Sequence, residues 1–172
     1  FKEMQESRAG GKTIVGGFIG GWIAVELMKR HRGVSIATGD LLALPICIGV
    51  AVGRIGCFLT GLADGTAGIA TTMPWGVDFG DGIRRHPAQL YEVAFVLVLA
   101  AVITRRRAAL RAVPGDAFKL FLASYVTFRL LVDFIKPGVT IAGLTSIQWA
   151  CLAVLAFYLP HLPRLAAEVR RG

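Results

Sequence analysis

The sequence predicts an all-α protein, a polytopic bundle of about five transmembrane helices. Hydrophobic residues make up 55% of the 172 residues and charged residues only 17%, with a mean hydropathy of +0.62. The apolar residues come in long runs, and the basic residues lie in short clusters between these runs. This pattern is too apolar for an ordinary soluble domain and indicates one membrane domain over residues 1–172.

The predicted spans are long apolar runs bounded by charged, proline or glycine residues. They cover residues 13–28, 41–59, 87–104, 117–135 and 144–162. Asp40 precedes the second span as its expected N-cap, and Pro87 opens the third span, where proline costs least. The glycine-rich connection 60–86 is expected to be an outer loop of irregular backbone, with Trp75 at the membrane interface.

Basic residues set the expected orientation, because short cytoplasmic connections are enriched in Lys and Arg. Three lie between the first two spans, four between the third and fourth and three in the tail, against two in loop 60–86 and one after the fourth span. We therefore expect the amino terminus outside and the carboxyl terminus in the cytoplasm, although the basic residues before the first span run against this rule. Membrane topology, rather than nucleic acid binding, explains the net charge of +8.

Two arginines lie inside apolar spans, and a charge inside a bilayer-length helix is a functional hypothesis by default. Arg54 lies roughly 8 Å from the outer end of the second span, and Arg129 lies roughly 9 Å from the outer end of the fourth. Two guanidinium groups at one depth predict an anion site, with a lipid phosphate as the expected anion. The alternative is structural, since Asp133 lies four residues after Arg129 and is placed to form an ion pair with it.

Several other residues have simpler explanations. Glu26 lies four residues before Arg30 and is expected to pair with it at the membrane edge.

The chain begins at Phe1 without a basic region and cleavage site, so we expect no signal peptide and further spans before this point. The three cysteines form no metal motif, and no metal or other cofactor is predicted. Small residues at every fourth position predict helix packing on one face of the second span: Gly49, Gly53, Cys57 and Gly61.

The segment that enters the third span from outside carries polar groups at the level of the two arginines. It reads His86-Pro87-Ala88-Gln89-Leu90-Tyr91-Glu92. A histidine beside a proline is commonly a capping or surface group, but beside a phosphate site it becomes a candidate substrate contact. On the fourth span, Tyr125 shares one helical face with Arg129 and Asp133.

In these segments the sequence resembles the prolipoprotein diacylglyceryl transferases of bacterial inner membranes. The motifs stand in the same order and at similar spacing over nearly the whole chain. The residues that carry the resemblance are Gly53-Arg54-Ile55-Gly56 with Gly61 and Gly65, Pro74-Trp75, the segment from Arg85 to Glu92, and Tyr125 to Arg129 with Asp133.

The resemblance implies transfer of the diacylglyceryl group of phosphatidylglycerol to the lipobox cysteine thiol of a prolipoprotein signal peptide, which releases glycerol phosphate. Arg54 and Arg129 would hold the lipid phosphate and stabilise the leaving group. The candidate base is His86, because it is the only histidine that the expected topology places on the outer face. The site would face the outer leaflet of the bacterial inner membrane, with membrane lipids and no nucleic acid as partners. The substrate-binding residues implied are Gly16, Gly17, Cys57, Gly65, Gln89, Tyr91, Tyr125 and Asp133.

The sequence departs from the family pattern at three positions. Val15 stands where the family has a histidine before paired glycines, Cys57 where it has an asparagine, and Leu62 where it has its signature acidic residue. The first change removes a candidate base, and the second replaces an amide by a thiol. Two alternatives therefore stay open: a transferase with another acceptor, and a divergent protein that binds phospholipid without catalysis. A small-solute transporter is disfavoured, because the sequence has no internal repeat.

Overall fold

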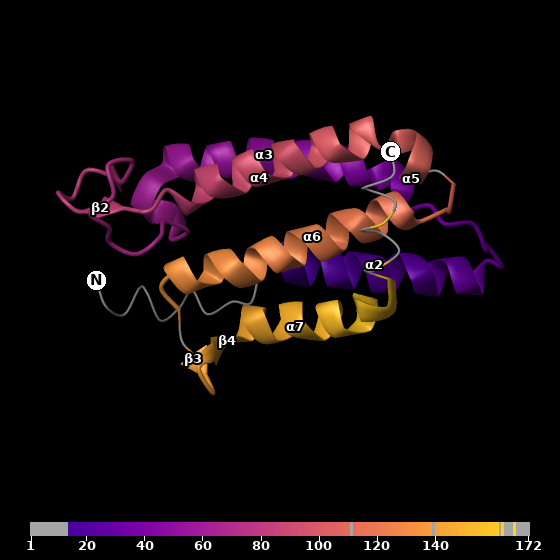
Figure 1. Cartoon of the computed structure of the whole chain (residues 1–172). Coiled ribbons are helices and arrows are strands. Elements are labelled where there is room, and N and C mark those ends of the chain that lie inside the picture. Colours follow the sequence, from indigo (N-terminus) through magenta and orange to yellow (C-terminus); the bar gives the residue numbers. More distant parts are fainter. Residues whose placement is uncertain (1–13, 111, 139, 162, 164–166, 168–172) are drawn as a thin grey trace. The chain divides into compact units, whose positions relative to one another are not determined.

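A computed structural model gives the structure of the protein and describes residues 14–110, 112–138, 140–161, 163 and 167. The described residues are mostly helical, with two small antiparallel β-hairpins (Figure 1). By its contacts the chain divides into two compact units, and the second begins at Ala37. The first unit contains α2 (Ile14–His31), and the second contains all the other elements.

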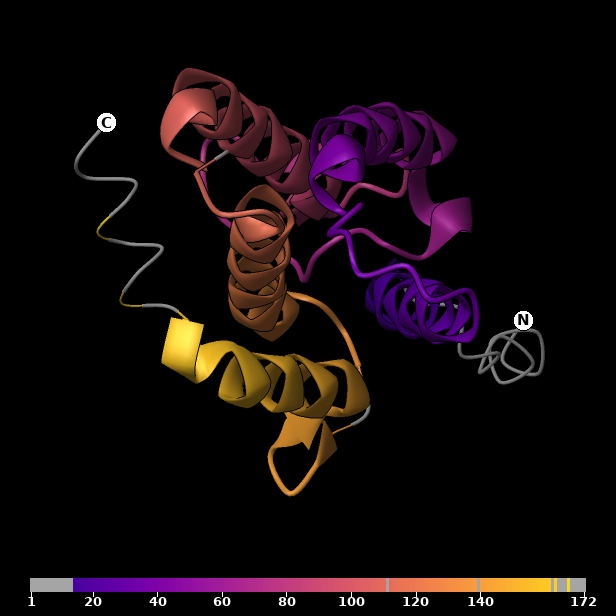
Figure 2. The same ribbon diagram turned by 90° about the vertical axis from the view of Figure 1, so that its right-hand side faces the viewer.

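The second unit is built on the helices α3 (Asp40–Thr60), α4 (Ala88–Arg105), α6 (Asp116–Val132) and α7 (Ser146–Tyr158). In Figures 1 and 2, α3 and α4 lie side by side, and α6 lies between this pair and α7. With α2, a helix therefore lies in each segment predicted as a span. The shorter elements are η1 (Gly61–Asp64), β1 (Val77–Asp78), β2 (Arg84–Arg85), α5 (Arg107–Leu110), η2 (Asp133–Ile135), β3 (Thr140–Ile141), β4 (Leu144–Thr145) and η3 (Leu159–His161).

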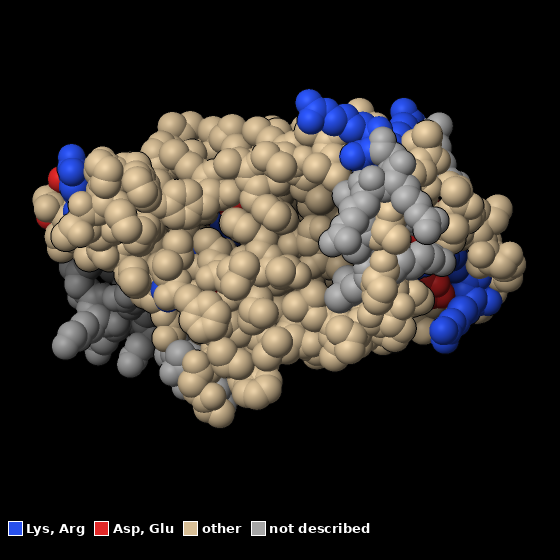
Figure 3. All heavy atoms as spheres, in the orientation of Figure 1, with Lys and Arg blue, Asp and Glu red and all other residues tan. Residues whose placement is uncertain are grey.

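In the described part of the chain, two helical segments are long and apolar enough to cross a bilayer, Asp40–Asp64 and Ala88–Arg105. Figure 3 shows Lys and Arg side chains near α5 and near the β1–β2 hairpin, whereas the surface over α4 and α6 between these ends carries mostly other residues. This distribution agrees with the predicted helical membrane protein. The number of spans and their direction stay predictions.

The buried face of α3 is not the glycine face that the sequence pattern indicated. It is formed by Ala43, Cys47, Ala51 and Arg54. Gly49 and Gly53 are exposed, and a Cβ at either position would meet no described atom within 4 Å. The close helix packing predicted for the glycine face is therefore not found within the second unit.

Asp40 has a different role from the expected one. It is the first residue of α3, whose N-cap position is held by Gly39. Its carboxylate accepts hydrogen bonds from the backbone N–H groups of Gly115 (2.6 Å) and Phe118 (3.0 Å), at the start of α6. A carboxylate at a helix N-terminus satisfies free N–H groups and complements the helix dipole. Asp40 therefore caps α6, and the prediction that it caps its own helix is wrong.

We expect Asp40→Ala to lower the free energy of unfolding by about 1–2 kcal/mol, because two backbone donors of α6 lose their acceptor. The measurement is denaturant or thermal unfolding of the purified full-length protein in detergent. Glu26→Ala is the control, since it removes only a helix-surface ion pair with Lys29 (2.9 Å), a type worth about 0.3–0.5 kcal/mol. Equal stability of the two variants would contradict the capping role of Asp40.

Two further expectations are corrected by the structure. Glu26 pairs with Lys29, three residues along, and not with Arg30. The connection 60–86 is also more regular than predicted, since it contains η1 and the β1–β2 hairpin, and Ala70 bridges to Arg85. The connection is also tied to the segment after α6, because the N–H of Ile69 donates to the carbonyl of Ile135.

Candidate functional site

Arg54, Glu92 and Tyr125 form a buried polar network where α3, α4 and α6 meet. The Nε atom of Arg54 lies 2.8 Å from Oε2 of Glu92, and the hydroxyl of Tyr125 donates to Oε1 of the same carboxylate. Arg54 is 6% exposed, and both partners are completely buried. A buried charge is costly unless it is paired and hydrogen-bonded, so this network lets Arg54 lie among apolar helices.

Arg129, on α6, is held by a second carboxylate, that of Asp133 at the start of η2. Its Nη2 donates to Oδ1 of Asp133 at 3.0 Å, which is the pair that the four-residue spacing indicated. Oδ2 of Asp133 accepts a hydrogen bond from the hydroxyl of Thr145. Thr145 also forms a capping box with Gln148 at the start of α7. The end of α6 is thereby tied to the start of α7 beside Arg129.

Some buried polar atoms beside these pairs have no hydrogen-bond partner among the described residues. They are Nη1 of Arg129 and both amide atoms of Gln89, which is completely buried. Gln89 lies on the same face of α4 as Glu92, nearly one turn closer to the helix start. A buried polar group left without a partner costs about 1–3 kcal/mol. A ligand with an acidic group for Arg129 and a hydroxyl for Gln89 would satisfy these atoms.

His86 is oriented by two aromatic side chains at the entrance to α4. The indole N–H of Trp75 donates to the hydroxyl oxygen of Tyr91 (2.8 Å), and this oxygen lies 3.0 Å from Nδ1 of His86. The contact with Tyr91 occupies Nδ1, so Nε2 is the ring nitrogen left for a substrate. The prediction placed Trp75 at the membrane interface; the structure shows a side chain that is 56% exposed and hydrogen-bonded within the site.

A backbone strap, Gly68–Ile69, joins His86 to the end of α6. The N–H of Gly68 donates to the carbonyl of His86 (2.9 Å), and the N–H of His86 donates to the carbonyl of Ile69 (3.1 Å). The N–H of Ile69 in turn donates to the carbonyl of Ile135 (2.8 Å). A Cβ on Gly68 would lie 2.7 Å from Cβ of His86 and 3.0 Å from the carbonyl oxygen of Ile135. Only glycine fits between these neighbours, and the strap fixes His86 next to the segment that follows Asp133.

The remaining predicted residues are less closely tied to this cluster. Nη1 of Arg54 donates to the sulfur of Cys57 at 3.9 Å, which is a weak contact. Gly65 ends η1 with a φ of +67°, a conformation that favours glycine, and its Cβ position faces open space. Gly16 and Gly17 belong to α2, in the first unit. The substrate-binding roles of these four residues stay predictions.

Sequence reasoning missed Glu92 and Lys136 as members of the cluster. Glu92 is the only charged residue in the predicted span 87–104, so the argument that selected Arg54 would also have found Glu92. Lys136 follows a predicted span directly, a position at which a lysine is ordinarily assigned to topology. The positive charges of Arg129 and Arg54 lower its pKa, and this neighbourhood comes from the fold and has no sequence signal.

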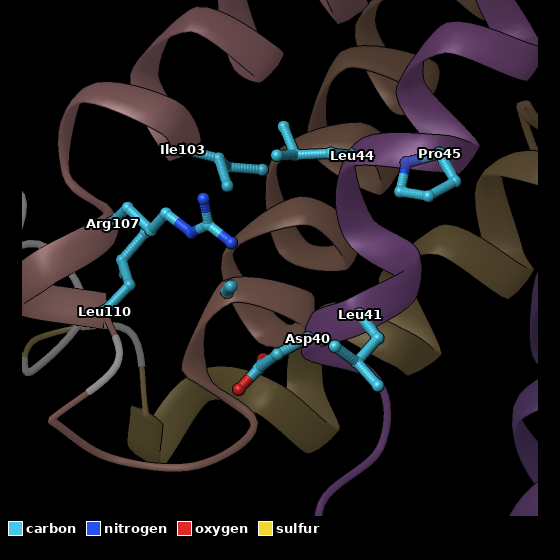
Figure 4. Close-up of a pocket in the computed structure, with 8 residues that line it drawn as sticks. Asp40, Leu41, Leu44, Pro45, Ile103, Arg107 and Leu110 are labelled. Carbon is cyan, nitrogen blue, oxygen red and sulfur yellow. The ribbon is translucent and has the colours of Figure 1, made fainter.

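A cavity of about 180 Å³ lies elsewhere in the second unit, where the start of α3 meets the end of α4 and α5 (Figure 4). Its walls are mainly apolar, including Leu44 and Ile103, and the guanidinium of Arg107 points between them. The carboxylate of Asp40 also borders the cavity but is engaged by the backbone of α6. The cavity contains none of the predicted site residues, so the buried arginine cluster is the better candidate site.

Membrane-length helices are typical of a helical membrane protein, and two buried arginine–carboxylate pairs make its candidate site. Figure 3 shows Lys or Arg atoms at the bottom of a hollow between α4 and α6. The family model for prolipoprotein diacylglyceryl transferase matches residues 1–162, and the chain belongs to this family.

Curated relatives carry the name phosphatidylglycerol–prolipoprotein diacylglyceryl transferase. The relative from Methylobacillus flagellatus is 33% identical over 159 residues, which cover 85% of this chain and 58% of the relative. The relative from Bordetella parapertussis is 34% identical over 156 residues, with the same two coverages, and the relative from Nitrosomonas europaea is 34% identical over 157 residues, covering 86% and 55%. The chain thus spans less than two thirds of the length of these relatives.

Proposed function

We propose that this protein transfers the diacylglyceryl group of phosphatidylglycerol to the lipobox cysteine of prolipoproteins, at the outer leaflet of the bacterial inner membrane. Membership of the family and the names of the relatives support this activity. The observation that carries the proposal is the pair of buried arginines, of which Arg129 keeps a buried Nη1 without a partner among the described residues. A guanidinium group presents a planar donor fork that matches phosphate oxygens.

The proposed reaction is a displacement at the carbon of the diacylglyceryl group that is bonded to a phosphate oxygen. The cysteine sulfur forms a bond to this carbon while the carbon–oxygen bond to phosphate breaks, and the electron pair goes to the phosphate oxygen. Arg54 and Arg129 stabilise the charge that develops on the departing glycerol phosphate. Nε2 of His86 takes the thiol proton, in the tautomer whose Nδ1–H donates to the hydroxyl oxygen of Tyr91. Gln89 offers its amide to the hydroxyls of the glycerol headgroup.

Complementation tests the proposed function directly. The full-length gene is expressed in a strain depleted of its own diacylglyceryl transferase, and growth with diacylglyceryl-modified lipoproteins is the expected result. Purified full-length protein in phosphatidylglycerol vesicles should also add the mass of a diacylglyceryl group to a lipobox peptide. A peptide whose cysteine is replaced by serine is the matched control and should stay unmodified.

Val15 favours a second candidate, a phospholipid-binding membrane protein without catalysis. The family pattern has a histidine at this position, and its loss removes one candidate base. Such a protein would keep the arginine cluster and bind phosphatidylglycerol, yet transfer nothing to any thiol. The vesicle assay distinguishes the two functions, because binding without transfer supports only the second.

The proposed location of the site makes a topological prediction. A cysteine placed at position 106 should react with a cysteine-specific label only from the cytoplasmic side, and a cysteine at position 78 only from outside. The reason is that the basic clusters set the orientation. The measurement uses a membrane-impermeant maleimide on inside-out and right-side-out vesicles that carry Arg106→Cys or Asp78→Cys. Both variants are made in a protein without its own cysteines. Reversed labelling would place Arg54 and Arg129 in the wrong leaflet.

A further inference from the structure

The positive charges of the two arginines in the cluster are each balanced by the negative charge of a carboxylate. Arg54 is paired with Glu92 at 2.8 Å, and Arg129 with Asp133 at 3.0 Å. Both carboxylates are almost completely buried, so solvent does not weaken either pair. The two pairs together supply hydrogen-bond donors for an anion but no excess positive charge. An anionic substrate therefore needs a further cation to balance its charge in this buried place.

Lys136 is the described residue that meets this need. It follows η2, and its backbone N–H donates to the carbonyl of Asp133 at 3.2 Å. Its side chain is half-buried and has no ion pair or hydrogen bond within the described part of the chain. The preceding residue, Ile135, accepts a hydrogen bond from the backbone strap Gly68–Ile69, which also holds His86. The fold thus places Lys136, which has no ion pair among the described residues, directly after the segment that contains Asp133.

The electrostatic neighbours of Lys136 come from each part of the cluster. They are Arg54 on α3, Glu92 on α4, Arg129 on α6 and Asp133 in η2. With Lys136, the cluster holds three cations and two carboxylates, which leaves one net positive charge. The phosphodiester of phosphatidylglycerol carries one negative charge, so the occupied site would be electrically balanced.

We propose that Lys136 supplies the net positive charge of the site and contacts the phosphate of the bound lipid, as a third cation beside Arg54 and Arg129. This inference rests on the proposed function for the identity of the lipid. It also bears on product release, because glycerol phosphate is a phosphate monoester with about −1.5 to −2 charge at pH 7 and would leave a site that is balanced for one negative charge.

The protonation of Lys136 gives the proposal a measurable signature. The residue lies just beyond the predicted fourth span, and burial together with the positive charges of Arg129 and Arg54 lowers its pKa to about 8. The ammonium form therefore dominates at neutral pH and is lost as pH rises through about 8. A bound phosphate favours the ammonium form, so the affinity for an anionic lipid should fall over the same range. A shift of one pKa unit on binding corresponds to about tenfold in affinity.

The test measures binding of a short-chain phosphatidylglycerol to the full-length protein in detergent, from about pH 6 to about pH 10. We expect the affinity of the wild type to fall about tenfold as Lys136 deprotonates. Lys136→Arg should bind as well as the wild type at low pH and lose the fall, because arginine stays charged throughout. Lys136→Met should bind weakly at every pH. Arg84→Met is the control for loss of an exposed charge and should behave as the wild type.

Two results would overturn the proposal: wild-type binding by Lys136→Met, or the same fall in affinity with pH in Lys136→Arg and the wild type. The arginine variant decides the question even where the methionine variant fails to fold. Transfer to a lipobox peptide is measured in the same preparations to separate the two proposals. Lipid binding that depends on Lys136 without any transfer overturns the transferase function but supports Lys136. Transfer that is unchanged in Lys136→Met overturns only the role of Lys136.

Discussion

Replacing Arg129 with alanine is expected to lower the rate of diacylglyceryl transfer by about a hundredfold to a thousandfold. This is the usual effect of removing one donor that stabilises a developing charge. Arg54→Ala should have a similar effect, because the two guanidinium groups are proposed to share the phosphate. Lysine at either position should rescue poorly, since a point charge replaces a planar fork. The measurement is the rate of lipobox-peptide modification in phosphatidylglycerol vesicles.

The two alanine variants differ in their structural cost. Arg54→Ala leaves Glu92, which is completely buried, without its cation, and removing one partner of a buried pair costs about 3–5 kcal/mol. In Arg129→Ala, Asp133 keeps its hydrogen bond from Thr145, so this variant is the cleaner test. Arg84→Ala, in the exposed β2 strand, is the matched control and should be nearly as active as the wild type. Full activity in an alanine variant would remove that arginine from the mechanism.

Replacing His86 with glutamine is expected to lower transfer by roughly two to four orders of magnitude, the usual contribution of a general base. A thiol with an ordinary pKa near 8.5 is only a few per cent thiolate at neutral pH, so the acceptor needs a group that takes its proton. Binding of phosphatidylglycerol should change little, because the arginine cluster is intact. The two measurements are peptide modification and lipid binding in one preparation.

Cys57 offers a competing route, in which its own sulfur forms a covalent intermediate with the diacylglyceryl group. Cys57→Ser separates the two routes, because a hydroxyl keeps the shape of the side chain but is far less nucleophilic. Loss of activity in His86→Gln with full activity in Cys57→Ser supports the direct transfer. If both variants transfer at the wild-type rate, the proposed path of the proton is wrong.

The positions of the helices could be predicted from the sequence because each is a long apolar run with charged or proline residues at its ends. The pair of Arg129 with Asp133 could also be predicted, since the two residues are neighbours on one helix surface. Partners on other elements could not be predicted in this way. The sequence does not show that Glu92 pairs with Arg54, or that Asp40 caps α6, because both contacts depend on how separate helices pack.

Several site residues were selected by their resemblance to the family and not by spacing. Gln89 is an example, because a glutamine near the start of a helix is unremarkable until the structure shows it completely buried without a partner among the described residues. The glycine face of α3 shows the opposite case. Its regular spacing predicted close packing, but the buried face of α3 is formed by two alanines, Cys47 and Arg54.

The ion pair between Arg54 and Glu92 also has a consequence for how the chain is inserted during synthesis. Each is the only charge inside its predicted span, and on insertion scales an arginine or acidic residue in an isolated helix costs up to about 2.5–3.5 kcal/mol, the value at the helix centre. Helices that entered lipid one after the other would each carry an unpaired charge. A hairpin of α3 and α4 carries a neutralised pair instead. The insertion machinery is therefore expected to retain α3 until α4 has emerged from the ribosome, so that the two helices leave it together.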